Sequence, residues 1–395
     1  MRTRVHAEYN ASMGRRALIV LLGACSFDPP AAAGDVSPMD VAPTIDARDS
    51  VTEDAASDAP PGCTPGFFDL CVQAPATDPF TVTGIESFDT DLDPRCRTFD
   101  QATGPDVCLV MATSVDITGT LQVSGTRPLA LASSAQLSIS GELDVSSRRG
   151  GRTGPGADDG SCTMTRLPEP DEGGGGGAAG GSVGGPGGDG GIGDADSSLG
   201  GDGVALNGTA GAPISTLTYL RAGCGGARGG NEGQGGGAGG DGGRGGGGLY
   251  ATAITTISIT GRIRATGAGG TGGSVQAGGG GGGAGGIVIL EAPSIVIDGQ
   301  LSANGGGGGE GGARIGGNPV SGVAGSDGDY GTAAAAGGAG SDIRFGFGGA
   351  GAVGTTAAVA GTDTSLGGGG GGGSVGAIRL LGTRQGSGLV TPPAP

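Results

Sequence analysis

The chain has 395 residues, of which 99 are glycine, and its formal net charge is −17. All 21 basic residues are arginine, because lysine is absent, so a Schiff-base lysine and a Walker-type phosphate loop are excluded. The only histidine is His6, which lies ahead of the expected processing site. We therefore expect no catalytic residue, no metal site and no cofactor, and the acidic surface argues against a nucleic-acid partner.

The N-terminal stretch "MGRRALIVLLGACS", from Met13 to Ser26, has two arginines followed by an apolar run that is too short to span a bilayer. This pattern predicts a secretory signal peptide at 1–24, with translation starting at Met13. The motif "LGAC" resembles the lipobox of bacterial lipoproteins, and the resemblance implies that Cys25 is the lipid attachment site. The alternative is an ordinary signal peptide in which Cys25 is a plain thiol.

Residues 25–62 are rich in proline, alanine and aspartate and show no apolar periodicity. We expect a disordered acidic tether that separates the folded part from the membrane.

Six cysteines remain after Cys25, an even number that predicts up to three disulfides in an exported chain. Cys162 and Cys224 share one long glycine-rich segment, so we expect them to pair. The other four would pair among themselves in an order that spacing leaves open: Cys63, Cys71, Cys96 and Cys108.

Four segments of equal length align without gaps, at 107–125, 129–147, 249–267 and 287–305. Each is apolar at unit positions 1, 3, 9, 11, 15 and 17, which predicts short strands with one buried face. Position 13 is always glycine, and a degenerate fifth unit at 72–90 keeps this glycine, so we expect a tight backbone corner there. The corner glycines are Gly84, Gly119, Gly141, Gly261 and Gly299.

The degenerate unit has Glu86 where the other units are apolar, so we place it at the N-terminal end of the stack. Successive units can follow each other after 22 residues. The pattern therefore predicts an all-β fold, a short right-handed parallel β-helix of about five coils of ~22 residues, with long glycine-rich insertions from one corner. An antiparallel sandwich of hairpins is the alternative.

The expected domains follow from these units. Beyond the signal peptide and the tether, they are a cysteine-rich cap with the degenerate coil at 63–106, coils at 107–147, a glycine-rich insertion at 148–248, coils at 249–305, a second insertion at 306–377, and a terminal strand and tail at 378–395.

The insertions contain Gly-Gly-X triplets, for example "GGPGGDGGIG" from Gly184. A helix with three residues per turn would place every X on one edge and leave two glycine edges for close backbone packing. A disordered linker is the alternative. The acidic run "DTDLDPRCRTFD" from Asp89 spaces carboxylates like a calcium loop, but it lacks the required glycine and final glutamate, so we expect ordinary loop acids.

The lipobox, the Asp/Pro tether, "CTPGFFDLC" at 63–71 and the "GGGGAGGIVILEA" unit together resemble glycine-rich surface lipoproteins of GC-rich Gram-negative bacteria. The similarity to PE-PGRS proteins is one of composition only. The resemblance implies an exported protein anchored by lipid at the outer membrane or cell surface, with the periplasmic face as the other option. It would contact envelope polysaccharide or other surface proteins.

From these features we expect a non-enzymatic cell-envelope protein that displays a glycine-rich face in a structural, adhesive or matrix role. The alternatives are a carbohydrate-active enzyme that uses carboxylates, and an ice- or polysaccharide-binding protein.

Overall fold

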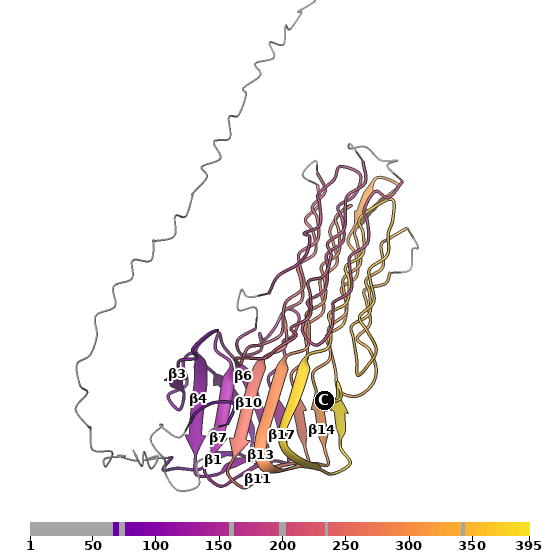
Figure 1. Ribbon diagram of the computed structural model, residues 1–395. Coiled ribbons are helices and arrows are strands. Elements are labelled where there is room, and N and C mark those ends of the chain that lie inside the picture. Colours follow the sequence, from indigo (N-terminus) through magenta and orange to yellow (C-terminus); the bar gives the residue numbers. More distant parts are fainter. Residues whose placement is uncertain (1–65, 71–75, 158–161, 197–202, 234–235, 341–343) are drawn as a thin grey trace, which may run out of the picture. The chain divides into compact units, whose positions relative to one another are not determined.

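The computed structural model describes residues 66–70, 76–157, 162–196, 203–233, 236–340 and 344–395 (Figure 1). Within these ranges the regular elements are all strands, and no helix occurs. The strands are β1 (Phe80–Val82), β2 (Ile85–Asp89), β3 (Arg97–Phe99), β4 (Val107–Ala112), β5 (Val115–Ile117), β6 (Thr120–Ser124), β7 (Leu129–Ser133), β8 (Gln136–Ile139), β9 (Glu142–Asp144), β10 (Gly248–Ala253), β11 (Thr256–Ile259), β12 (Arg262–Arg264), β13 (Ile287–Ile297), β14 (Gln300–Ser302), β15 (Ala313–Ile315), β16 (Asn318–Val320), β17 (Ala377–Gln385) and β18 (Leu389–Thr391).

The predicted right-handed parallel β-helix of about five ~22-residue coils is wrong. The strands instead form a ten-stranded mixed sheet and a six-stranded parallel sheet, which curl as an open half-barrel, and a separate two-stranded hairpin. The large sheet is mixed because β3 pairs antiparallel with β4. Apolar alternation reports one buried face per strand, but it does not report how strands group into sheets, and the long glycine-rich segments interrupt any regular coil.

The second and third strands of each unit pair in the register that the repeat alignment predicts. Val115, Leu137 and Ile257 are successive partners in the large sheet, and Leu121, Leu143 and Ile263 are successive partners in the six-stranded sheet. All six side chains are buried in one core, so the pattern at unit positions 9 and 15 reports a real apolar ladder.

The first strand departs from the alignment by one residue in two units. Cys108, and not Val107, lies opposite Leu129, and Val288, and not Ile287, lies opposite Leu249. Both faces of these strands are buried, so both residue sets are apolar and alternation cannot choose between them.

The degenerate unit forms the N-terminal end of the stack, as its sequence predicts. Among the described strands, β1 pairs only with β5 and β2 only with β6. The first strands of the four units, β4, β7, β10 and β13, lie side by side and are called the first-strand row. The antiparallel strand β3 pairs with β4 at the N-terminal edge of this row. At the other end, β17 and β18 add a sixth level by pairing with β13 and β14.

Two apolar layers hold the sheets. The inner layer lies between the large and the six-stranded sheets, and it contains the repeat side chains. The second layer covers the other face of the first-strand row, where Phe68 packs against Tyr250 at a ring-centroid distance of 4.9 Å. Glu291 fixes this layer, because its Oε2 accepts hydrogen bonds from the Phe67 amide at 2.8 Å and the Tyr250 hydroxyl at 2.9 Å.

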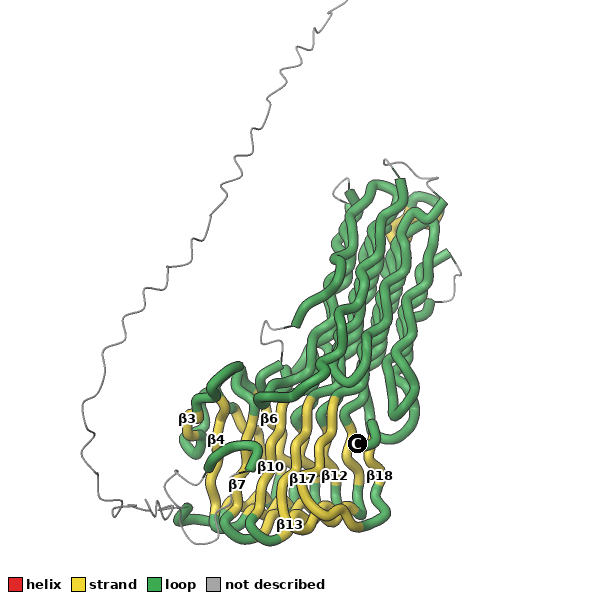
Figure 2. Tube along the Cα trace, viewed as in Figure 1, coloured by secondary structure: helices red, strands yellow, loops and turns green. Residues whose placement is uncertain are grey.

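Three long glycine-rich segments connect a strand of the six-stranded sheet to a strand of the large sheet. They run from β9 to β10, from β12 to β13 and from β14 to β17. Figure 2 shows them as long extended loops beyond the ends of the strands.

Candidate functional site

The corner glycines form a column with one glycine in each level. A Cβ on Gly141 would lie 1.9 Å from the carbonyl oxygen of Gly119, and one on Gly261 would lie 2.0 Å from that of Gly141. Gly84 begins the column and has nothing within 4 Å of such a Cβ. Glycine is therefore required wherever a neighbouring level lies on the side that the Cβ would face, and Gly388 extends the column on Gly299.

The glycine-rich segments form an ordered bundle, which we call the glycine bundle. Its central segment, 278–285, hydrogen-bonds through its backbone with six neighbouring segments in a repeat of three residues. Gly278, Gly279 and Gly280 donate to carbonyls of three different segments, and Gly281, Gly282 and Gly283 repeat this order. The six neighbouring segments are 224–230, 368–374, 265–271, 240–246, 178–181 and 306–309.

Composition separates inner from outer segments of the bundle. The inner segments 173–181, 278–285 and 305–312 are almost entirely glycine and buried, because a Cβ on them would meet a neighbouring carbonyl oxygen. The outer segment 236–244 has the Gly-Gly-X triplet, and its X side chains are exposed at Ala238, Asp241 and Arg244. The period-three pattern therefore marks the surface of the bundle, and unbroken glycine marks its interior.

One inner segment contains a carboxylate. Glu310 is 1% exposed, and its side-chain oxygens accept hydrogen bonds from the amides of Val323 at 2.8 Å and Gly340 at 2.6 Å. Backbone donors thus replace the water that a buried carboxylate loses. Glu310, the only acidic residue in the run at 305–312, therefore makes fixed hydrogen bonds inside the bundle.

Cys162 and Cys224 are joined, with their Cα atoms 5.5 Å apart and a sequence separation of 62. Cys224 is buried in the second apolar layer, and its carbonyl accepts the amide of Ala284 in the central glycine segment. The disulfide therefore ties the 148–248 segment to the place where the glycine bundle meets the large sheet.

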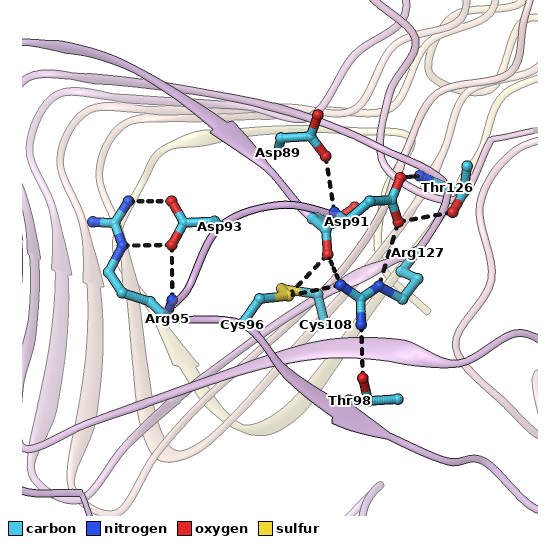
Figure 3. The surroundings of a disulfide bond; sticks show 10 residues. Asp89, Asp91, Asp93, Arg95, Cys96, Thr98, Cys108, Thr126 and Arg127 are labelled. Atoms are coloured by element: carbon cyan, nitrogen blue, oxygen red, sulfur yellow. Dashed lines mark hydrogen bonds and ion pairs between the residues drawn. A yellow bond between two sulfur atoms is a disulfide. The ribbon is translucent and has the colours of Figure 1, made fainter.

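The second described disulfide joins Cys96 to Cys108 beside the acidic loop at 89–100 (Figure 3). The Asp91 carboxylate accepts the amide of Thr126 at 2.7 Å and its hydroxyl at 2.8 Å, and Arg127 Nε lies 3.4 Å from it. Asp89 accepts the amide of Asp91 at 2.8 Å. The loop acids thus bind protein donors, and no group of three His, Cys, Asp or Glu side chains that could hold a metal occurs in the described part of the chain.

Arg95 closes the N-terminal end of the inner core. Its guanidinium lies 5.0 Å from the Phe80 ring centre and 5.1 Å from that of Phe88, and it binds Asp93 through two hydrogen bonds of 2.9 and 2.7 Å. These hydrogen bonds hold the pKa of the Asp93 carboxyl below its usual value. A charged cap over two aromatic rings shields an otherwise open end of the core.

Residues 327–331 cross the outer face of the six-stranded sheet. The Tyr330 ring lies 4.4 Å from the Arg264 guanidinium and 5.1 Å from that of Arg262, and its hydroxyl donates to Glu142 at 2.7 Å. Burial and the Glu142 carboxylate raise the pKa of Tyr330. Asn304 fixes the same segment by donating to the carbonyl of Asp329 at 2.8 Å.

An arginine-lined cleft of about 690 Å³ lies between residues 148–151 and the flank of the glycine bundle. Its walls include Arg148, Arg149, Arg244 and Asp241, together with glycine backbone at 225–226, 242–243 and 269. Sequence reasoning did not find this site. The available signal is the run "RRGGR" at 148–152, which places three arginines together in an acidic chain.

The predicted site residues fall into two groups. The corner glycines and the Cys162–Cys224 pair are where the sequence places them, and the open choice among the other cysteines is settled for Cys96 and Cys108. Cys25, Cys63 and Cys71 lie outside the described residues.

Comparison with known proteins finds no matching family model, no matching curated protein and no matching solved structure. Within the described ranges, no helix has the length and apolar character needed to cross a membrane. The two disulfides indicate an oxidising compartment, extracellular or periplasmic.

Proposed function

We propose that this chain is an exported, lipid-anchored cell-envelope protein without enzymatic activity, and that it displays the glycine bundle in a structural, adhesive or matrix role. The observation that carries the proposal is the exposure of the X side chains on an ordered backbone lattice. A helix of three residues per turn spaces such side chains about 9.3 Å apart along each segment. Regular spacing of this kind suits repeated weak contacts with a polymer or another surface.

The outer layer formed by residues 321–328, 333–340, 346–353 and 357–364 is the best candidate for the contacting surface. Its segments are joined through backbone hydrogen bonds, such as Ser326 to Ala336 and Val359 to Ala350. The exposed side chains there are mostly small and uncharged, and they include Ala336 and Ala360.

Cell attachment tests the display role. Cells that express the full chain should aggregate or attach to matrix more than cells without it, and Ala336→Glu with Ala360→Glu should remove most of this gain. The matched control is Arg384→Glu, which changes charge at an exposed position on β17 and should leave attachment unchanged. Equal attachment by both variants would contradict the proposal.

The anchor has its own test. The lipobox supports lipidation of Cys25, so [³H]palmitate should label the full chain and not the Cys25→Ala variant. Labelling that survives the substitution would refute this attachment site.

An ice- or polysaccharide-binding role is the second candidate, and the same uncharged outer layer favours it. Thermal hysteresis in solutions of the purified protein would support ice binding, and its loss in Ala336→Glu would assign it to this layer. Polysaccharide cleavage that one aspartate substitution abolishes would instead favour an enzyme and would overturn the display proposal.

A further inference from the structure

The arginine-lined cleft is a candidate binding site that is separate from the outer layer of the glycine bundle. Among the residues that the structure describes, three guanidinium groups and one carboxylate line it, although the whole chain has a net charge of −17. Neighbouring arginines repel one another, so their grouping in an acidic protein does not stabilise the fold by itself. Such a group is suited to binding an anion.

The described carboxylates near Arg148 compensate its charge only in part. Asp144 lies 2.5 Å from Arg152, whereas Arg148 reaches it only at 4.0 Å. Asp241 pairs with Arg228 at 3.5 Å on the exposed side of the bundle. The Arg148 charge is therefore only weakly compensated within the protein.

Arg149 also lines the cleft, and its guanidinium donates a hydrogen bond to a neutral group. Its guanidinium donates to the carbonyl of Gly325 at 2.6 Å, which is a neutral acceptor and which holds the side chain in place. The nearby Asp327 carboxylate accepts the backbone amides of Arg149 at 3.0 Å and Gly269 at 2.9 Å. These contacts preorganise the loop at 148–151 and keep positive charge at the cleft wall.

The shape of the cleft favours a small, hydroxyl-rich anion. Its volume of about 690 Å³ suits a ligand of about two or three sugar rings. The glycine walls are peptide backbone, and the Thr271 hydroxyl accepts the Asp241 amide at 2.6 Å, so the lining is polar and held in place where it is not charged. An arginine fork matches the two oxygens of a carboxylate.

We propose that this cleft binds a short acidic oligosaccharide through the carboxylate of a uronic acid, with Arg148 and Arg149 as the anion-binding groups. Binding here does not depend on where the protein is anchored or on what its outer layer contacts. A failure of this proposal and a failure of the display role are therefore separable.

Calorimetric titration of the purified full chain tests the proposal, with trigalacturonate as probe and maltotriose as the neutral comparison. Arg148→Gln should weaken trigalacturonate binding about tenfold, as loss of one charge-assisted hydrogen bond predicts. Arg384→Gln, at an exposed position on β17, is the matched control and should bind as the wild type does.

A second variant guards against a folding effect. Met164→Trp fills the cleft without changing its charge, so it should also weaken binding while the unfolding temperature stays within a few degrees. Absence of binding in the wild type, equal affinity of Arg148→Gln, or equally tight binding of maltotriose would each overturn the proposal. Inorganic sulfate or phosphate that binds as tightly as trigalacturonate would also overturn it, because the site would then recognise a free oxyanion.

Discussion

At the residue scale, the corner glycines act through the absence of a Cβ and not through positive φ angles. In the corner column each level lies so close to the next that a methyl group would overlap a carbonyl oxygen. Glycine is required at Gly141 and change is tolerated at Gly84, because only Gly141 has a neighbouring level on the side that its Cβ would face.

Gly141→Ala should lower the free energy of unfolding by about 1–3 kcal/mol, the usual cost of overpacking. Gly84→Ala, at the same unit position, should change it by less than about 1 kcal/mol. Urea unfolding of both variants measures the difference. Equal destabilisation would show that the corner torsion, and not the close approach, selects glycine.

The buried Tyr250 and the half-buried Tyr330 make stability depend on alkaline pH. Burial raises the pKa of Tyr250, with the Glu291 carboxylate as a further cause. Burial and the Glu142 carboxylate raise the pKa of Tyr330 in the same way. Since the folded state holds these protons more tightly, their contribution is fully present below the unfolded-state pKa of about 10 and is lost as pH rises above it.

The free energy of unfolding should therefore decrease between pH 10 and 12. Tyr330→Phe should make this decrease shallower, although it costs about 1 kcal/mol at neutral pH through loss of the hydrogen bond to Glu142. Thermal unfolding at a series of pH values gives both quantities. A slope identical to that of the wild type would contradict the role assigned to Tyr330.

At the scale of elements, strands and glycine segments use backbone hydrogen bonds in different ways. Strands pair with two neighbours in one plane and bury side chains on their faces, whereas the central glycine segment bonds in six directions. Most inner positions leave no room for a side chain, and the exceptions at Ala178, Ala179, Ala284 and Glu310 are buried at specific places, which explains why glycine dominates the interior.

Gly281→Ala places a Cβ 2.0 Å from the Ala179 carbonyl oxygen, whereas Gly185→Ala meets nothing within 4 Å. The first change should destabilise the bundle by about 1–3 kcal/mol, and the second should be close to neutral. Hydrogen exchange of the bundle amides reports this directly. Unchanged protection in Gly281→Ala would refute the close packing of segment 278–285.

At the scale of the whole molecule, sequence-distant segments are held together by cross-links and by the two apolar layers. The Cys162–Cys224 disulfide closes a much longer loop than Cys96–Cys108, with separations of 62 and 12 residues. Loop-closure entropy therefore gives it the larger share of stabilisation.

Replacing Cys162 and Cys224 together by serine should cost about 4 kcal/mol, and the same change at Cys96 and Cys108 about 3 kcal/mol. Chemical unfolding of the two double variants tests the order. A larger loss from the shorter loop would show that local packing, and not chain entropy, dominates.

Strands and their register could be predicted from the sequence where only one face of the strand is apolar. Ile257 and Ile263 have a single buried orientation, so alternation located their strands and their register. Val107 and Ile287 could not be placed in the same way, because both faces of their strands are apolar. Arg148, Arg149 and Arg244 come from segments far apart in the sequence, so no spacing rule could assemble their cleft.

The sequence by itself determined the strands of the repeat units and which glycines form their corners, because both depend on a period in the chain. Only the tertiary structure decided how the strands divide into two sheets, that an open half-barrel replaces closed coils, and how glycine segments pack around one centre. These properties depend on contacts between distant segments, and the free energy of such contacts leaves no period in the sequence.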